Sequence, residues 1–214
     1  MSGAQRFGLL IAAPLAVEAM AVRSGAPGVR VVRTGMGPRR AARAAARIER
    51  EPADVIAVAG VCGALDPSFE PGDLVVASTL IGPDRARIEL SSAGLAAALE
   101  RAGLRVHSGA IACVARLSDG QPRAELARRT GACAVDMESI WLAPAAAGRP
   151  FVVLRAVSDG PRHAFWRPAI VTQGIAALRS LRKAAPVLAA WAAEVSLSPA
   201  PIPSPAPALR QAQA

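Results

Sequence analysis

The stretch DVIAVAGVCGAL, residues 54–65, decides the fold of this chain. It is an almost uninterrupted apolar run that leads into a glycine-bearing turn, as expected of a strand buried on both faces of a sheet. Three other segments are also expected to be strands: FGLLIAA (7–13), VRVVRTG (29–35) and PFVVLRAVSDG (150–160). Buried strands of this kind are typical of parallel sheets whose two faces are covered by helices.

Segments with helical character alternate with these strands. Pro38 opens an arginine-rich helix, RRAARAAARIER, and proline is well tolerated in the first turn of a helix. Further helices are expected over residues 92–102, from Pro122 to about 129, after residue 136 and from about 168 to 194, and shorter strands over residues 73–79, 107–115 and 132–136. The alternation predicts an α/β fold, a single-domain three-layer α/β/α sandwich with a mostly parallel central sheet.

The length and composition agree with one folded domain. The chain has 214 residues, of which 52% are hydrophobic, and this is enough for a substantial buried core. We assign residues 1–195 to this domain and expect the tail, residues 196–214, which is rich in proline and alanine, to be disordered. No apolar run is long enough to span a membrane, and Glu18 interrupts the apolar N-terminal run, which favours a first core strand over a signal peptide.

The cysteine, histidine and charge content argue against several classes of function. The chain has three cysteines, an odd number without a CxxC pair, and two histidines, so neither disulfides nor a metal site is expected and a cytoplasmic location fits. The net charge of +9 comes almost entirely from arginine. Such a charge can signal nucleic acid or anionic lipid, but the chain has no tyrosine and few other aromatic residues on which bases could stack. No nucleic-acid partner is therefore expected.

Three carboxylates and two glycine turns lie near the ends of predicted strands, where ligands bind in parallel α/β sheets. Glu18 follows the first strand, Glu138 begins a helix and Asp159 ends the last strand. Asp159 and Glu138 also have simpler explanations, because Asp159 can cap the following segment and Glu138 suits a helix start. The turns TGMG (34–37) and AGVCGAL (59–65) allow backbone N–H groups to approach an anion or a sugar closely.

Four segments, in this order and spacing, resemble the nucleoside phosphorylase and nucleosidase superfamily that includes the methylthioadenosine/S-adenosylhomocysteine nucleosidases: RTGMGPRRAARAA, VIAVAGVCGALDPSFEPGDLVVAS, AVDMES and PFVVLRAVSD. The resemblance runs from about Gly8 to residue 190 and implies a phosphorylase/hydrolase-like catalytic domain. It implies cleavage of the N-glycosidic bond of a purine nucleoside, with water or phosphate as co-substrate, no further cofactor and a homo-oligomeric assembly.

Within the superfamily, the short chain, the PLAVEAM segment (14–20) and the VDMES segment (135–139) are most similar to the hopanoid-associated phosphorylases. Those enzymes act on adenosylhopane, a nucleoside attached to a triterpenoid lipid. This resemblance implies release of adenine from a lipid-linked nucleoside in hopanoid biosynthesis, with peripheral contact at the inner membrane. The region after residue 79 is also shorter than in the nucleosidases, which suits a bulky apolar 5′ substituent.

The resemblance also implies a role for each candidate site residue. Asp159 matches the acid that hydrogen-bonds or protonates the purine at N7, and Ser158 would orient it. Glu138 matches the carboxylate that accepts hydrogen bonds from the ribose hydroxyls, and Met137 would pack against the sugar. Glu18 matches, after a two-residue shift, the acid that activates a water molecule. Because the transition state is oxocarbenium-like, carboxylates beside the sugar would stabilise it.

Phosphate, if it is the nucleophile, would be held by the glycine turns. Gly35 and Gly37 lie in the first turn and Arg39 would add positive charge. Gly63 in the second turn is also expected to contact the substrate. Purine phosphorylases of the superfamily tend to have an arginine just before the central glycine turn, where this chain has the apolar residues 57–59. This departure argues mildly against a phosphorylase.

A second departure concerns recognition of the base. The nucleosidases carry a serine–glycine–aspartate stretch near the purine, where this chain has Cys113, Val114 and Ala115. This departure and the shifted position of Glu18 keep open a non-catalytic nucleoside-binding protein of the same fold. Two further alternatives are a methylthioadenosine/S-adenosylhomocysteine nucleosidase and an arginine-rich protein that binds anionic lipid or nucleic acid.

Overall fold

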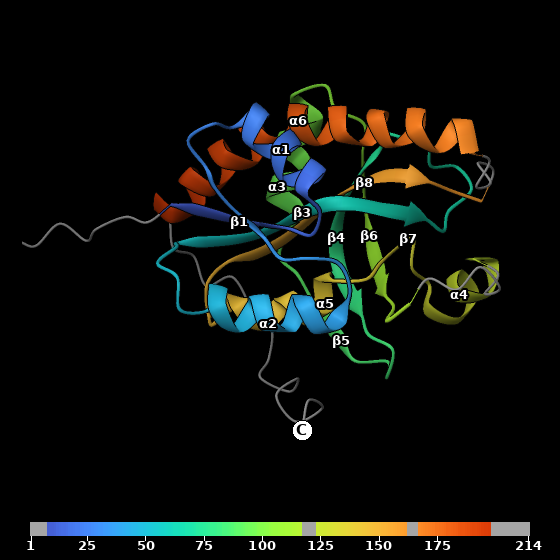
Figure 1. Cartoon of the computed structure of the whole chain (residues 1–214), viewed down its shortest axis with the longest axis horizontal. Coiled ribbons are helices and arrows are strands. Elements are labelled where there is room, and N and C mark those ends of the chain that lie inside the picture. The colour runs from blue at the N-terminus through green and yellow to red at the C-terminus, as the bar shows by residue number, and fades with distance from the viewer. Residues whose placement is uncertain (1–7, 117–122, 162–166, 198–214) are drawn as a thin grey trace, which may run out of the picture.

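The computed structural model describes residues 8–116, 123–161 and 167–197. A closed ring of strands lies at its centre (Figure 1). In pairing order the ring consists of β3 (Val55–Ala64), β8 (Phe151–Asp159), β4 (Leu74–Ile81), β6 (Val106–Cys113) and β7 (Ala134–Asp136), and β7 pairs with β3 again. The ring brings strands that are far apart in the chain to a common end.

The single α/β domain agrees with the prediction, but the sheet is mixed. β1 (Leu9–Ala13) and β2 (Arg30–Arg33) add parallel strands beyond β3, whereas β5 (Arg87–Glu89) adds an antiparallel strand to β4. β4 also runs antiparallel to β8, and β7 runs antiparallel to β3. The segment that joins β3 to β4, residues 65–73, is shorter than the roughly one dozen residues that a parallel crossover needs, so β4 runs in the opposite direction.

Helices cover the sheet on both faces (Figure 1). On one face lie α1 (Ala16–Gly25), α3 (Ala93–Arg101) and α6 (Arg167–Leu197). On the other face lie α2 (Pro38–Ile48), α5 (Ser139–Leu142) and the 3₁₀ helix η1 (Ala143–Ala146). A further short helix, α4 (Arg123–Thr130), packs beside β6 and β7 through Leu126.

The alternation of side chains along the strands divides the core in two. In β1, Leu10 and Ala12 belong to the core on the α2 side, whereas Leu9 and Ile11 belong to the core on the α1 and α6 side. β3 divides its apolar residues in the same way. Because consecutive side chains of a strand point to opposite faces, burial on both faces explains why these strands are continuous apolar runs.

Most predicted elements are present, with ends that differ by a few residues. The sequence pattern does not reveal α1, which buries only three residues, or β5, which has three residues. Pro122, the predicted start of a helix, lies outside the described residues, and so does the tail from residue 198, whose disorder stays a prediction. Within the described parts of the chain, no helix is both long and apolar enough to cross a membrane.

The contact between α1 and α6 gives a test of this packing. A Cβ atom on Gly25 would overlap the backbone carbonyl of Arg182 and lie 3.0 Å from the Cβ of Ala185. We expect Gly25→Ala to lower the free energy of unfolding by about 1–3 kcal/mol, because overpacking forces the two helices apart. Gly28→Ala is the matched control, since a Cβ there meets nothing within 4 Å. Urea denaturation of both variants checks this, and equal stabilities would contradict the close contact.

Candidate active site

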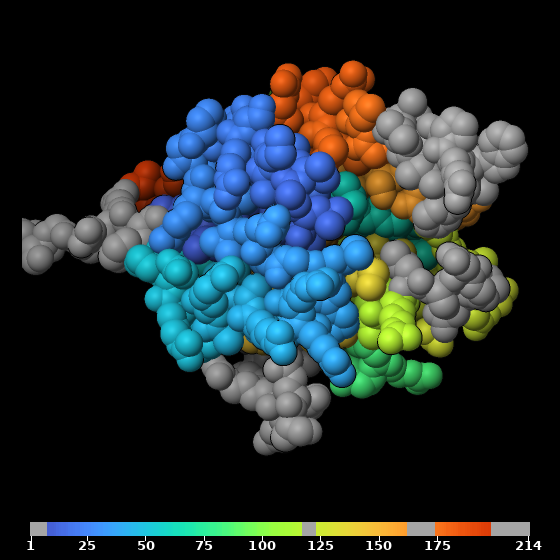
Figure 2. Space-filling view, in the orientation of Figure 1, coloured from blue at the N-terminus to red at the C-terminus, as the bar shows by residue number. Residues whose placement is uncertain are grey.

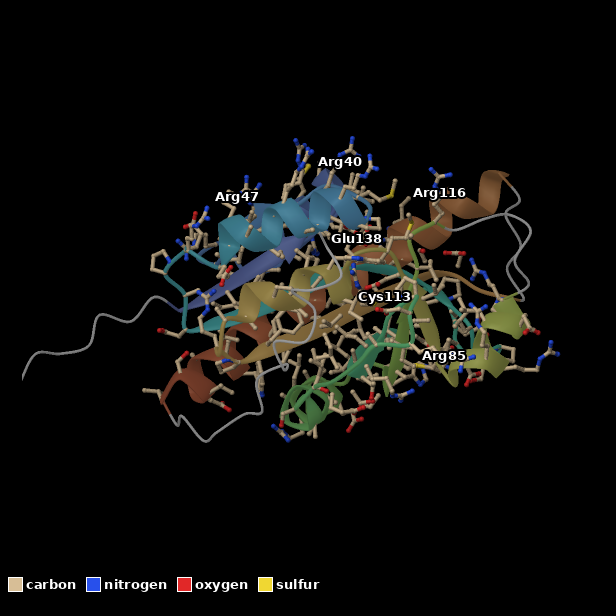
Figure 3. All side chains as sticks on the ribbon, turned by 90° about the horizontal axis from the view of Figure 1, so that it is seen from below. Arg40, Arg47, Arg85, Cys113, Arg116 and Glu138 are labelled. Atoms are coloured by element: carbon tan, nitrogen blue, oxygen red, sulfur yellow. The ribbon has the colours of Figure 1, made fainter. Side chains whose placement is uncertain are left out.

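A cavity of about 100 Å³ opens where the start of α1, the residues before α2 and the ends of β3, β7 and β8 meet. The predicted catalytic and substrate-binding residues all line it: Glu18, Gly63, Met137, Glu138, Ser158 and Asp159. Figure 3 shows Glu138 in the interior, beside the N-terminal end of α2. The fold therefore gathers residues from four separate parts of the chain at one place.

A single buried guanidinium holds one wall of this cavity together. Arg155 on β8 is 0% exposed, and its Nη2 lies 2.6 Å from the Asp136 carboxylate, 2.9 Å from the Ser139 hydroxyl and 3.6 Å from Oε2 of Glu138. The Ser139 hydroxyl also donates to the Asp136 carboxylate. Arg155 Nε has no hydrogen-bond partner among the described residues. Because a buried charge is tolerated only when it is paired, Arg155 and its carboxylates depend on one another.

Glu18 is a third carboxylate near Arg155. Its Oε2 accepts a hydrogen bond from the Leu15 N–H (2.6 Å) and its Oε1 accepts one from the Val61 N–H (2.8 Å). It is buried in the first turn of α1, where the helix dipole favours a negative charge. Gly60 provides the necessary space, because a Cβ there would lie 2.5 Å from Nη1 of Arg155 and 2.8 Å from Oε1 of Glu18.

The carboxylates outnumber the one buried cation. Burial raises the pKa of Glu18 and of Glu138, the charge of Asp136 adds to the rise, and Arg155 opposes it. Burial by itself would lower the pKa of Arg155, but Asp136, Glu138 and Glu18 raise it above its ordinary value. A carboxyl group with a raised pKa exchanges protons closer to neutral pH, which suits acid–base catalysis.

Hydrogen bonds to the backbone fix the position of Glu138. The carboxylate of Asp136 accepts hydrogen bonds from the N–H groups of Glu138 and Ser139, each at 3.4 Å. The Gly37 N–H donates to Oε1 of Glu138 at 2.9 Å, which ties the loop before α2 to the junction between β7 and α5. Met137 is half-buried and lines the cavity next to Glu138.

Asp159 lies at the end of β8, beyond a β-bulge. The strand pairing shifts there, so that Ser158 is the extra residue between the partners of Cys62 and Gly63. The Ser158 hydroxyl lies 2.7 Å from Oδ1 of Asp159 and 3.1 Å from the Cys62 carbonyl oxygen. Arg123 of α4 forms an ion pair with Oδ2 of Asp159 and also donates to the Asp159 carbonyl oxygen at 3.2 Å. Ser158 and Arg123 together therefore set the position of the candidate acid.

The candidate phosphate-binding residues Gly35, Gly37 and Arg39 do not line this cavity. The Gly35 N–H donates to the Pro14 carbonyl oxygen at 3.1 Å and the Gly37 N–H donates to Glu138, so both amides are used within the protein. Arg39 is exposed in the first turn of α2 and does not line the cavity. In the parts of the chain that the structure describes, no group of three or more His, Cys, Asp and Glu is placed to hold a metal ion.

Three residues of the site were not singled out by the sequence analysis: Arg155, Asp136 and Arg123. Arg155 and Asp136 could have been recognised from the sequence, because each is a charged residue in or at the end of an apolar strand. Charged residues are rarely fully buried unless they are paired, so two such residues suggest a buried ion pair. Nothing in the sequence marks Arg123 as a site residue, because its pairing with Asp159 depends on how α4 packs against the end of β8.

The raised pKa of Glu18 predicts a dependence of stability on pH. The folded chain retains a proton above pH 4.5 that the unfolded chain releases, so the free energy of unfolding should fall as the pH rises above 4.5. Glu18→Gln removes this proton exchange, and we expect a shallower fall in that variant. Urea denaturation between pH 4.5 and about 8 measures the difference, with Glu100→Gln on the exposed side of α3 as the control. Equal slopes in Glu18→Gln and the parent would contradict the expectation.

Comparison with known proteins agrees with the fold. The model of the phosphorylase superfamily matches residues 16–168. Futalosine hydrolase from Streptomyces coelicolor is 32% identical over 233 residues, which cover 86% of this chain and 97% of that protein. A futalosine hydrolase mutant of Helicobacter pylori has a similar structure, with a TM-score of 0.73 at 17% identity over 87% of this chain and 99% of that chain.

The 5′-methylthioadenosine/S-adenosyl homocysteine nucleosidase of Campylobacter jejuni is also similar in structure, with a TM-score of 0.72 at 18% identity over 86% of this chain and 97% of that chain. At such low identity the two structures show a shared fold. The family model covers most of the chain, and the resemblance seen in the sequence is confirmed at this level. The chain belongs to the phosphorylase superfamily and is an enzyme of that family.

Proposed function

We propose that this chain is a nucleosidase that uses water to cleave the N-glycosidic bond of a purine nucleoside. The observation that carries the proposal is the placement of three carboxyl groups, those of Glu18, Glu138 and Asp159, around one cavity. Cleavage of this bond builds positive charge on the sugar and negative charge on the leaving base. Such a reaction needs carboxylates beside the sugar and a proton donor beside the base, and the three groups supply both.

The proposed step is a hydrolysis in which the bond between the ribose C1′ and the base breaks with its electron pair on the base. Asp159, which pairs with Arg123 in the free protein, takes up a proton from solvent when the substrate binds and passes it to N7 of the purine, so that the base leaves neutral. Water attacks C1′ and gives a proton to Glu18, whose raised pKa suits this role. Glu138 accepts hydrogen bonds from the ribose hydroxyls, and Met137 packs against the sugar.

Two features support water over phosphate as the nucleophile. The Gly35 and Gly37 N–H groups, which would have to hold a phosphate, already donate to Pro14 and Glu138. The residues just before the central glycine turn, 57–59, are buried and apolar and add no positive charge. Each oxygen of Glu18 accepts one backbone N–H and retains a second lone pair with which it can accept a proton from water.

We further propose a bulky apolar 5′ group on the substrate, with adenosylhopane as the nucleoside and adenine as the released base. Met36, which lines the cavity, is 52% exposed, and Val17 (51%) and Met20 (66%) are exposed on α1, the helix whose Glu18 lines the same cavity. Figure 2 shows α1 and the segment that leads into α2 side by side on one face. Exposed apolar side chains on the segments that border a site suit a lipid substituent.

The outer surface of α2 supports peripheral contact with an anionic membrane. Its exposed residues include Arg39, Arg40, Arg43 and Arg47 (two of them are labelled in Figure 3). Basic side chains of this kind are attracted to anionic headgroups. A homo-oligomer is also part of the proposal. A cavity of about 100 Å³ is too small to enclose a lipid-linked nucleoside, and a neighbouring subunit would cover the part of the substrate that extends beyond it.

A second candidate substrate is futalosine. The observation that favours it is the 32% identity to futalosine hydrolase from Streptomyces coelicolor, over 97% of that protein. The chemistry at the N-glycosidic bond would be the same for the two candidates.

The test is release of free purine base from a panel of nucleosides: methylthioadenosine, adenosine, futalosine and an adenosine with a long apolar 5′ chain. We expect release without phosphate, with the highest kcat/KM for the long apolar chain. Asp159→Asn should slow release about 100- to 10,000-fold, because general acid catalysis is lost. Asp66→Asn, a carboxylate outside the cavity, is the matched control and should leave the rate unchanged.

Each departure from this result has a distinct meaning. Release that requires phosphate would identify a phosphorylase, and a preference for futalosine would select the second substrate. Full activity of Asp159→Asn would overturn its role as the acid. Tight binding of a nucleoside without any release would replace the enzyme with a nucleoside-binding protein.

Arg123 is expected to act on the reaction by positioning Asp159. Once Asp159 has given up its proton, the guanidinium stabilises the carboxylate that forms. Arg123→Gln should lower kcat about 10- to 100-fold, the equivalent of one charge-assisted hydrogen bond, and change the pH profile of kcat. Arg123→Lys should recover part of the rate, and Arg128→Gln, an exposed arginine of the same helix, should have no effect. Equal losses in the Gln and Lys variants would indicate a purely structural role.

A further inference from the structure

A second, larger cavity of about 440 Å³ lies between the turn that joins β4 to β5 and helix α4. It shares no lining residue with the candidate active site. The walls of the two cavities meet where Cys113 on β6 pairs with Asp136 on β7, and where the Val114 N–H donates to the Asp136 carbonyl oxygen at 2.8 Å. A molecule in the second cavity is therefore close to the active site but separated from it by paired backbone.

Three arginines from three elements surround the second cavity. They are Arg85 in the turn, Arg87 on β5 and Arg129 on α4. Among the described residues, none that lines the cavity is acidic. Arg87 lies 3.9 Å from Glu89, and the ion pairs of the described chain include neither Arg85 nor Arg129. Because guanidinium groups remain charged at neutral pH, three of them around one hollow favour an anion between them.

The turn holds Arg85 in an uncommon conformation. The Gly82 N–H donates to the Ala86 carbonyl oxygen at 2.8 Å, and the Arg85 N–H donates to the Gly82 carbonyl oxygen at 3.1 Å. Arg85 has φ of +63°, in the left-handed region that residues with a side chain rarely adopt. Strained backbone of this kind is often found at ligand sites. Figure 3 shows Arg85 on the same side of the molecule as Cys113 and far from Arg47.

The inner wall of the cavity is apolar. It is formed by Ile81, Ala112, Cys113, Val114 and Leu126. Ile81, Ala112 and Leu126 belong to one buried cluster, so this wall is firmly packed. A cavity of about 440 Å³ is in the size range of small-molecule sites, and its apolar wall favours the burial of an apolar group.

We propose that this cavity binds an organic phosphate, a phosphate monoester whose organic part is a compact apolar group. The phosphate oxygens accept hydrogen bonds from two or more of the guanidiniums, and arginine suits such paired contacts. The organic part covers the wall around Ile81 and Leu126. This site goes beyond the proposed hydrolysis, because none of the residues that line it also lines the cavity in which the N-glycosidic bond would be cleaved.

Isothermal titration calorimetry with phenyl phosphate, inorganic phosphate and benzoate tests the proposal on the full chain. We expect phenyl phosphate to bind at least about tenfold more tightly than either of the others, because only it has both the charge and the apolar group. Arg85→Gln with Arg129→Gln should weaken phenyl phosphate binding by about tenfold or more. Arg47→Gln with Arg50→Gln removes the same charge from exposed positions around the end of α2 and should leave binding unchanged.

The remaining outcomes overturn the proposal in separate ways. If phenyl phosphate binding is weakened equally in the two double variants, the anion is attracted by the overall positive charge of the protein and not by this cavity. If inorganic phosphate binds as tightly as phenyl phosphate, the apolar wall does not contribute to binding. If benzoate binds more tightly than phenyl phosphate, the site prefers a carboxylate to a phosphate. Unchanged phenyl phosphate binding in the Arg85 and Arg129 variant would place the anion outside this cavity. Calorimetry measures binding whether or not base is released, so the result is independent of the proposed function.

Discussion

The ion pair between the buried Arg155 and Asp136 is the interaction on which the rest of the site depends. Neither charge could be buried alone, because the loss of hydration would not be compensated. Together they allow two further carboxyl groups, those of Glu18 and Glu138, to be buried nearby. Burial raises the pKa values of both, the charge of Asp136 adds to the rise, and the single cation Arg155 opposes it only in part. The site therefore contains three buried carboxyl groups near a single buried guanidinium, and this excess of acidic groups is what suits it to proton transfer.

The closed ring of strands is what makes this arrangement possible. β8 carries Arg155, which pairs with Asp136 and Glu138, and it ends in Ser158 and Asp159, which line the cavity. β7 pairs with only the last residues of β3, where Gly63 lies opposite Val135, and this short pairing brings Met137 and Glu138 to the same end. The bulge at Ser158 turns the last residues of β8 towards the cavity.

The mixed direction of the sheet matters for the second cavity as well. β4 and β6 are parallel to each other and end beside the turn that carries Arg85, while α4 covers the same end. The two cavities therefore lie on either side of the paired β6 and β7. One has buried carboxylates and the other has exposed arginines, and this contrast in charge suits two different ligands.

The sequence by itself determined the class of fold, most of the strands and helices, and three of the carboxylates that line the cavity, those of Glu18, Glu138 and Asp159. It could do so because strands that are buried on both faces are continuous apolar runs in the sequence. A carboxylate at the end of such a run is easily recognised, because charged residues are uncommon there. It could not determine that β4 runs antiparallel to β8, that Arg123 pairs with Asp159 or that the glycine amides are already used by Pro14 and Glu138. Those features join residues far apart in the chain, and only the packing of the whole domain decides which of them meet.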